Sequence, residues 1–220
     1  MKNVISAFLV LLLVFVLALP AQASPISALA GSTTARLSLA SSGAQADDDS
    51  EIPAISADGR FVAFYSEASN LLNGDTNGFA DIFVHDRQTG ETKRVSVDSS
   101  GHEANGENSD SYMAISGDGR YVAFSSEATN LVSRDTNNAG DIFVHDRQTS
   151  QTRRVSVASN GAEANGGSGA VDISDDGRYV TFSSGATNLV AGDTNGTRDV
   201  FVYDLQTGVT TLVSVNTNGE

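Results

Sequence analysis

The sequence contains no cysteine, and it has few basic residues. Without cysteine the chain can form no disulfide bond and can carry no lipid on an N-terminal cysteine. It has 13 lysine and arginine residues against 27 aspartate and glutamate residues, which gives a formal net charge of −14 at pH 7. An acidic surface argues against nucleic acid and anionic membranes as partners, and it suits cations or basic proteins.

Long apolar runs are absent except at the N-terminus. There Lys2 precedes an apolar run over residues 4–19, and Ala21-Gln22-Ala23 has the small-x-small form of a cleavage site. The pattern predicts a secretory signal peptide over residues 1–23, followed by a small-residue linker over 24–35. The alternative is an N-terminal membrane anchor, for which a span needs about 20 residues. We therefore expect a periplasmic or secreted protein with no stable membrane insertion after cleavage.

Helical periodicity is absent from the rest of the chain, which instead repeats itself at a step of about 60 residues. Two motifs share this step. The motif Ser-x-Asp-Gly-Arg begins at Ser56, Ser116 and Ser174, and the motif Asp-Thr-Asn begins at Asp75, Asp135 and Asp193. A repeat of this length predicts stacked supersecondary units, as in a solenoid or a propeller.

One repeat contains four predicted strands, at residues 52–56, 60–66, 81–86 and 92–97, with a hairpin turn at 57–59. The two middle strands are apolar on both faces, so both faces must be covered. The fourth strand alternates polar and apolar residues, as a half-exposed edge does. A four-stranded antiparallel sheet repeated with both faces buried is a propeller blade. The fold class is therefore predicted to be all-β. Within this class a propeller is favoured over a β-sandwich, because a sandwich does not predict a repeat of this length.

The pattern Ser-x-Asp-Gly-Arg-Tyr-Val-Ala-Phe-Ser-Ser, with Asp-Ile-Phe-Val-x-Asp about 20 residues later, resembles the TolB-like β-propeller repeat family. These are WD-like repeats of the TolB type, here of the variety with a long Asp-Thr-Asn loop. The resemblance covers residues 36–220. It implies a propeller in which most motif residues are turn and packing residues, and it implies engagement of other envelope or secreted proteins.

The repeats divide the chain into unequal parts. Residues 36–51 are expected to be the outer strand and loop of a preceding blade, followed by blades at 52–110, 111–170 and 171–220. Known propellers have about four to eight blades, so three blades leave the ring incomplete. We expect a fragment of a larger ring; the alternative is self-association, in which two copies pair into one ring.

The Asp-x-Asn loops are the candidate metal sites. Oxygen ligands at positions 1, 3 and 7 of such a loop suit calcium, the one cofactor that the sequence suggests. The candidate ligands are Asp75, Asn77, Asp81, Asp135, Asn137, Asp141, Asp193, Asn195 and Asp199. Position 5 lacks a carboxylate, and position 12 (Asp86, Asp146 or Asp204) should lie out of reach along a strand. The alternative is that these side chains only stabilise turns.

No catalytic constellation is evident. His85 and His145 occupy matched strand positions, with Tyr203 at the third, which is typical of packing and not of a zinc site. The sequence has no Gly-x-Ser-x-Gly motif of a nucleophilic serine. The chain is therefore expected to be a non-enzymatic scaffold that mediates protein–protein interaction in the cell envelope. Two alternatives are a calcium-stabilised surface or secreted protein that binds glycans or a matrix, and the propeller part of a larger hydrolase.

Overall fold

The computed structural model describes residues 34–216, without the side chains of residues 110 and 111. The predicted signal peptide at 1–23, and the predicted linker at 24–35 apart from its last two residues, lie outside the described residues. Residues 36–220 form one compact unit. In the described part of this unit all regular elements are β-strands, which confirms the all-β prediction.

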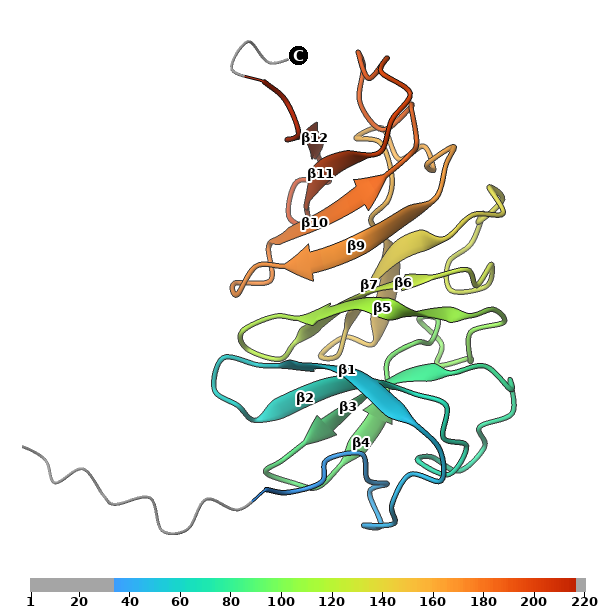
Figure 1. The fold of residues 1–220 in the computed structure, drawn as a ribbon, viewed down its shortest axis with the longest axis vertical. Coiled ribbons are helices and arrows are strands. Elements are labelled where there is room, and N and C mark those ends of the chain that lie inside the picture. Colours follow the sequence, from blue (N-terminus) through green and yellow to red (C-terminus); the bar gives the residue numbers. More distant parts are fainter. Residues whose placement is uncertain (1–33, 217–220) are drawn as a thin grey trace, which may run out of the picture. The chain divides into compact units, whose positions relative to one another are not determined.

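The strands of residues 34–216 form three antiparallel sheets of four, and each sheet follows the order of the chain (Figure 1). The first sheet contains β1 (Ser50–Ile55), β2 (Phe61–Ser66), β3 (Asp81–Asp86) and β4 (Thr92–Arg94). The second contains β5 (Asn108–Ile115), β6 (Tyr121–Ser126), β7 (Asp141–Asp146) and β8 (Gln151–Arg154). The third contains β9 (Ser168–Ile173), β10 (Tyr179–Ser184), β11 (Asp199–Asp204) and β12 (Thr210–Leu212).

The Ser-x-Asp-Gly-Arg motif forms the turn between the first two strands of each sheet. In the first sheet the Ser56 hydroxyl and the Arg60 backbone N–H both donate to Asp58 Oδ1, at 2.7 and 2.9 Å. Gly59 has a φ of +71°, which glycine adopts at no steric cost. The Arg60 side chain donates two hydrogen bonds to Asp86 at the end of β3. The same pair recurs as Arg120–Asp146 and Arg178–Asp204. The motif residues therefore hold the turn to the sheet.

The three sheets pack face to face. Phe124 and Phe143 of the second sheet share a buried cluster with Ile82 of the first sheet. Likewise Phe182 and Phe201 of the third sheet pack with residues of β7 in the second sheet. The first strands β1, β5 and β9 lie next to one another (Figure 1). Four-stranded sheets that stack by their faces, with the first strands adjacent, are the blades of a β-propeller.

Backbone hydrogen bonds also connect the blades through their turns. The Ala57 N–H donates to the Gly117 carbonyl, and the Gly117 N–H donates to the Asp175 carbonyl, both at 2.9 Å. Next to this contact, Gly119 has a φ of +71°, and a Cβ added there would lie 2.1 Å from Cδ2 of Phe61 in the preceding blade. Glycine is therefore required at this position by the backbone and by the neighbouring blade.

One face of the third blade is uncovered in the described part of the chain. Ile82 of β3 and Ile142 of β7 are fully buried by the next blade, whereas Val200, at the same position of β11, is 42% exposed. Val213 is likewise 45% exposed, although its counterparts Val95 and Val155 are buried. Three sheets therefore form an arc and not a closed ring.

Several strand predictions need correction. The first strand, predicted over residues 52–56, runs from Ser50 to Ile55, and the predicted blade boundaries at 110/111 and 170/171 fall inside β5 and β9. The fourth strand was predicted over residues 92–97, but β4 ends at Arg94 because the chain then bends back, with a bridge between Val97 and Glu103. The outer strand predicted at the start of 36–51 is not a strand; it makes only the bridge between Leu39 and Gln45. The described residues contain no neighbouring strand with which it could pair.

Candidate functional site

The Asp-x-Asn loops have the hydrogen bonds of a turn. The side-chain oxygen of Asn77 accepts from the backbone N–H two residues later, at 3.0 Å, and its side-chain nitrogen donates to Ala104 O at 3.2 Å. Asn137 and Asn195 form the same turn, at 3.1 and 2.8 Å. The asparagine of each loop is therefore used to fix the backbone, as the turn interpretation predicts.

The aspartates of the first loop surround an arginine. Arg94 Nη1 lies 3.4 Å from Asp75 Oδ1 and 2.5 Å from Asp81 Oδ2, and Arg94 Nη2 lies 2.6 Å from Glu103 Oε1. The Arg94 and Asp75 side chains are each 8% exposed and that of Asp81 is 1% exposed. We call this group, and its equivalents, the acid–arginine cluster. A planar guanidinium suits such an arrangement because it can donate to several carboxylates at once.

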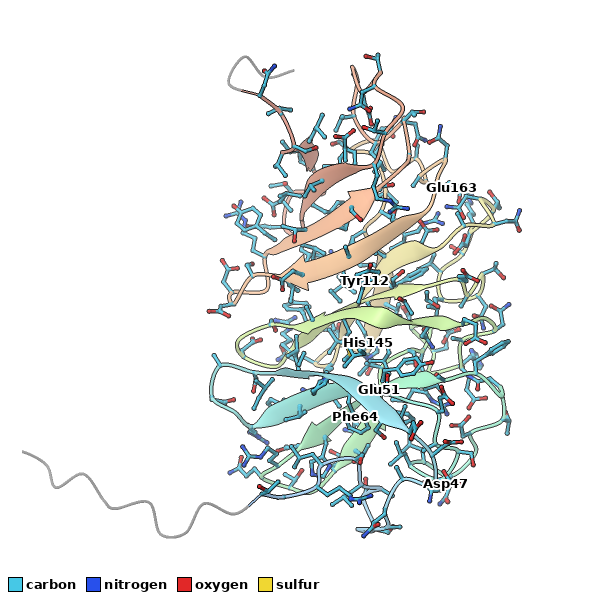
Figure 2. All side chains as sticks on the ribbon, in the orientation of Figure 1. Asp47, Glu51, Phe64, Tyr112, His145 and Glu163 are labelled. Carbon is cyan, nitrogen blue, oxygen red and sulfur yellow. The ribbon has the colours of Figure 1, made fainter. Side chains whose placement is uncertain are left out.

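The second blade repeats the cluster with Arg154. Its Nη1 lies 3.1 Å from Asp135 Oδ1 and 3.0 Å from Asp141 Oδ2, and its Nη2 lies 2.9 Å from Glu163 Oε2. Glu163, labelled in Figure 2, belongs to the loop that follows the second blade. Each cluster therefore joins the Asp-x-Asn loop, the last strand and the connection to the next blade.

Burial is the largest influence on the pKa values of the charged groups in the first cluster. Burial raises the pKa of Asp75, and the neighbouring Asp81 raises it further. Burial also raises the pKa of Asp81, against the hydrogen bond from Ser96 and the charge of Arg94. Burial alone would lower the pKa of Arg94, but the surrounding carboxylates outweigh it and raise that pKa. The guanidinium therefore opposes the rise that burial imposes on the pKa of both carboxylates.

The third blade lacks the arginine. The position of Arg94 and Arg154 is occupied by Leu212, which pairs with Phe201 as Arg94 pairs with Phe83. Asp193 is 9% exposed, and among the described residues neither of its side-chain oxygens has a hydrogen-bond partner. Asp199 accepts from Ser214 at 2.7 Å and from Asn195 at 2.9 Å. These hydrogen bonds lower the pKa of Asp199, so it is ionised at neutral pH.

The structure brings together some of the predicted ligands and separates others. In the first blade Asp75, Asp81 and Glu103 offer oxygens within 4.8 Å of one another, a spacing that could hold a metal ion. Arg94 already lies among these oxygens, so calcium would have to displace it. The aspartates at position 12, such as Asp86, bind the turn arginines at the other end of the strand. Calcium therefore stays a prediction for these loops.

The arginines and glutamates of the clusters did not figure among the predicted site residues. A signal was present in the sequence, because Arg94 and Arg154 each follow an Asp-Thr-Asn motif by the same interval and Leu212 breaks the series. The calcium-loop pattern uses ligands from one continuous segment. The arginine of the cluster comes instead from the fourth strand, and the glutamate comes from the connection to the next blade. These residues are seen to meet only when the strands are placed in three dimensions.

The two matched histidines are packing residues. His145, labelled in Figure 2, is 5% exposed, and its Nδ1 lies 2.9 Å from Thr152 Oγ1. Thr152 donates its only hydroxyl proton to the Val97 carbonyl. Nδ1 of His145 is therefore the donor to Thr152, which places the neutral ring's proton on that nitrogen. His85 makes the equivalent bond to Thr92, so the predicted packing role is confirmed.

The fold is that of a β-propeller with an incomplete ring. No family model and no curated protein matches the sequence. Among solved structures the chain is similar to TolB from Acinetobacter baumannii, with a TM-score of 0.46, 19% identity, and coverage of 77% of this chain and 33% of that chain. It is also similar to the β-propeller domain of the Trilobed protease from Pyrococcus furiosus (0.46, 14%, 74% and 41%).

A third similar structure is an oligogalacturonate lyase from Vibrio parahaemolyticus (TM-score 0.43, 12% identity, 72% of this chain and 37% of that chain). The chain thus spans less than half of the length of each of these proteins. The assignment as a propeller rests on the sheets themselves, described above. Within residues 34–216 no helix is long and apolar enough to cross a bilayer.

Proposed function

We propose that the chain is an exported β-propeller scaffold that binds a protein partner and carries no catalytic site of its own. The observation that carries this proposal is the uncovered face of the third blade. Val200 and Val213 are 42% and 45% exposed there. Grouped apolar side chains at an open sheet face are typical of a surface that a further blade or another protein covers.

The engagement of the repeated polar residues supports a non-enzymatic role. The motif arginines bind aspartates, the loop asparagines fix turns, and the histidines bond to threonines. Catalytic groups must instead reach a substrate at a cleft. The charged N-terminus, apolar run and cleavage-site residues of 1–23 support export.

A binding experiment tests the proposal. The immobilised chain and a Val200→Asp/Val213→Asp variant are each incubated with purified envelope proteins, and the bound proteins are compared by mass spectrometry. We expect at least one protein to bind the natural chain and to be lost with the variant, because charges on the open face prevent apolar contact. Equal retention by both chains would contradict the proposal, as would hydrolysis of peptides or glycans by the purified chain.

A further inference from the structure

A pocket of about 450 Å³ lies between the first and the second blade. Its floor consists of buried side chains and its rim of exposed ones, namely Val95, Val97 and His145 in the floor and Lys93, Ser100 and Ser150 at the rim. None of the lining residues belongs to the third blade, so the shape of the pocket does not depend on the uncovered face there.

Arg147, which also lines this pocket, has no carboxylate partner among the described residues. Its Nη1 donates to the Gly119 carbonyl, and its Nε is buried without an acceptor. Its Nη2 has no acceptor in residues 34–216 either, but unlike Nε it is not closed off from solvent. Burial lowers the pKa of Arg147, against the charges of Asp86 and Glu91. A guanidinium in this state gains from an anion that accepts its hydrogen bonds.

The guanidinium of Arg147 is held in place before any ligand binds. Its Cζ lies 4.2 Å from the centroid of the Phe61 ring, on which it stacks, and the bond to the Gly119 carbonyl fixes the orientation. A ligand that binds here therefore loses little affinity to the ordering of this side chain.

The rim contains a serine where the other two blades have a glycine. Ser150 has a φ of +58°, and Gly90 and Gly208 at the same position have φ values of +76° and +74°. This conformation is strained for serine and free for glycine. The Ser150 hydroxyl makes no hydrogen bond within the described part of the chain, so it can donate to a ligand. A strained residue at a pocket is a reason to look for a binding role there.

The junction of the second and third blades shows that the fold does not require these groups. Leu205 stands there at the position of Arg147, and Gly208 stands at the position of Ser150. The charge and the free hydroxyl are therefore features of one junction and not of the repeat.

The other charged residues of the pocket do not cancel the charge of Arg147. Asp98 borders the pocket, but its Oδ1 accepts from the backbone N–H groups of Ser100 and His102 at 2.8 and 2.9 Å. Its Oδ2 lies 2.8 Å from Nδ1 of His102, so both oxygens are engaged within the loop. Lys93 is 61% exposed and forms only a surface ion pair, which contributes little. The pocket is thus a positive site in a chain with a net charge of −14.

We propose that this pocket binds a small carboxylate that carries an apolar group. The carboxylate lies against Arg147 and Ser150, and the apolar group lies on Val95 and Val97 in the floor. This site goes beyond the protein-binding role proposed above. Because the open face belongs to the third blade, loss of one function leaves the other testable.

The test is a titration followed by nuclear magnetic resonance on the isotope-labelled full chain. The probe is 3-methylbutanoate, and 3-methylbutanamide and inorganic phosphate are titrated in parallel. We expect the carboxylate to shift the backbone amides of Ser100 and Gly101, which line the pocket, in a saturable way. The amide has the same shape without the charge, and phosphate lacks the apolar group, so each should bind at least about tenfold more weakly.

The variants use residues that the other blades carry. Arg147→Leu introduces the residue of the third blade and should weaken binding of 3-methylbutanoate at least about tenfold, because a charged hydrogen bond is lost. Arg87→Leu is the matched control, since Arg87 has the same place in the first blade but does not line the pocket; binding should be unchanged.

Ser150→Gly separates a contact with the ligand from an effect on stability. It should weaken binding about threefold or more, because a hydroxyl donor is lost, and it should raise the melting temperature, because the backbone strain is removed. A variant that weakened binding by damaging the fold would instead lower the melting temperature.

Three results would overturn the proposal: no saturable shift with 3-methylbutanoate, equal binding of the neutral amide, or equal binding by Arg147→Leu and the natural chain. Tighter binding of phosphate would also overturn it and would make the pocket a phosphate site. If Arg147→Leu fails to fold, the neutral amide and Ser150→Gly still decide.

Discussion

At the scale of single residues, one position of the repeat decides what the Asp-x-Asn loop binds. With Arg94 or Arg154 at the end of the last strand, two aspartates and a glutamate surround a guanidinium. With Leu212 there, Asp193 has no partner among the described residues. The Asp-Thr-Asn motif and the aspartate at position 7 are the same in all three blades, so these residues do not account for the difference; the residue in the fourth strand, 19 positions after the first aspartate, differs in the third blade. This is why the loop motif alone could not predict its ligand.

Removal of an arginine from a complete cluster tests this interpretation. Arg94→Met should lower the free energy of unfolding by about 3–5 kcal/mol, because it leaves buried carboxylates without a counter-charge. For a chain of this size the melting temperature should fall by roughly 6–20 °C. Calcium should restore part of the loss, since the oxygens of Asp75, Asp81 and Glu103 lie within 4.8 Å of one another.

Lys93→Met is the matched control for Arg94→Met. Its side chain is 61% exposed and pairs only with Glu91 in the described structure, so its removal should change stability by no more than about 0.5 kcal/mol. Thermal melts with and without calcium measure both variants. Equal losses for Lys93→Met and Arg94→Met would show that the cluster contributes little.

The buried histidines predict a pH dependence. Burial lowers the pKa of His85 and His145 in the folded state, whereas an unfolded histidine has a pKa of about 6.5. Below about pH 6.5 the unfolded chain therefore binds more protons than the folded chain, and stability falls as the pH falls. Above that pH both states are neutral, and this contribution to stability is constant.

Variants that carry tyrosine, as the third blade does at Tyr203, isolate this effect. We expect the melting temperature of His85→Tyr/His145→Tyr to depend less on pH between about 6.5 and 5 than that of the natural chain. Because the carboxylates are common to both proteins, the difference between the two profiles reports the histidines. Parallel profiles over this range would contradict the assignment.

At the scale of elements, the sequence predicted the sheets well and their ends poorly. Strands β2 and β3 were predicted almost to the residue, because apolar residues on both faces and a glycine turn leave few alternatives. The end of β4 was missed, since Val95 and Val97 continue the alternation although the chain bends after Arg94. Both valines are buried for another reason, namely contact with the next blade and its connection. Alternation alone cannot distinguish these two causes of burial.

The contact between blades at the turns can be tested with two glycines. Gly119→Ala should be clearly more destabilising than Gly90→Ala. Both have a positive φ, for which alanine costs about 1–2 kcal/mol, but only at Gly119 would the new Cβ meet the Phe61 ring. At Gly90 no atom lies within 4 Å of an added Cβ. The difference between the two losses of unfolding free energy, measured by chemical denaturation, reports the inter-blade contact. Equal losses would mean that the Phe61 side chain moves aside without cost.

At the scale of the whole molecule, the number of repeats was clear from the sequence, but the state of the outer faces was not. Every blade carries an apolar residue at the position of Ile82, whether or not another blade covers it. The repeat motif has an apolar residue at this position in every blade, so it does not distinguish a blade face that is covered from one that is exposed. The exposure of Val200 was therefore found only in the structure.

Charges at equivalent positions test whether that face is open in solution. Ile142→Asp should prevent folding, because it buries an unpaired carboxylate between two blades. Val200→Asp should change the stability by about 0.5 kcal/mol or less, as at other exposed positions. Thermal melts and sedimentation over a range of concentrations measure both. If Val200→Asp is as harmful as Ile142→Asp, the face is covered by a second copy.

The acid–arginine clusters have a consequence for the conditions in which the protein can work. Arg94 and Arg154 are covalently attached to the chain, so the positive charge that orders their loops cannot be diluted, exchanged or removed by a chelator. A loop held by a metal ion is ordered only where the ion is abundant. Two of the three blades therefore hold their loops with a charge of the chain's own and need no metal ion from the medium to do so.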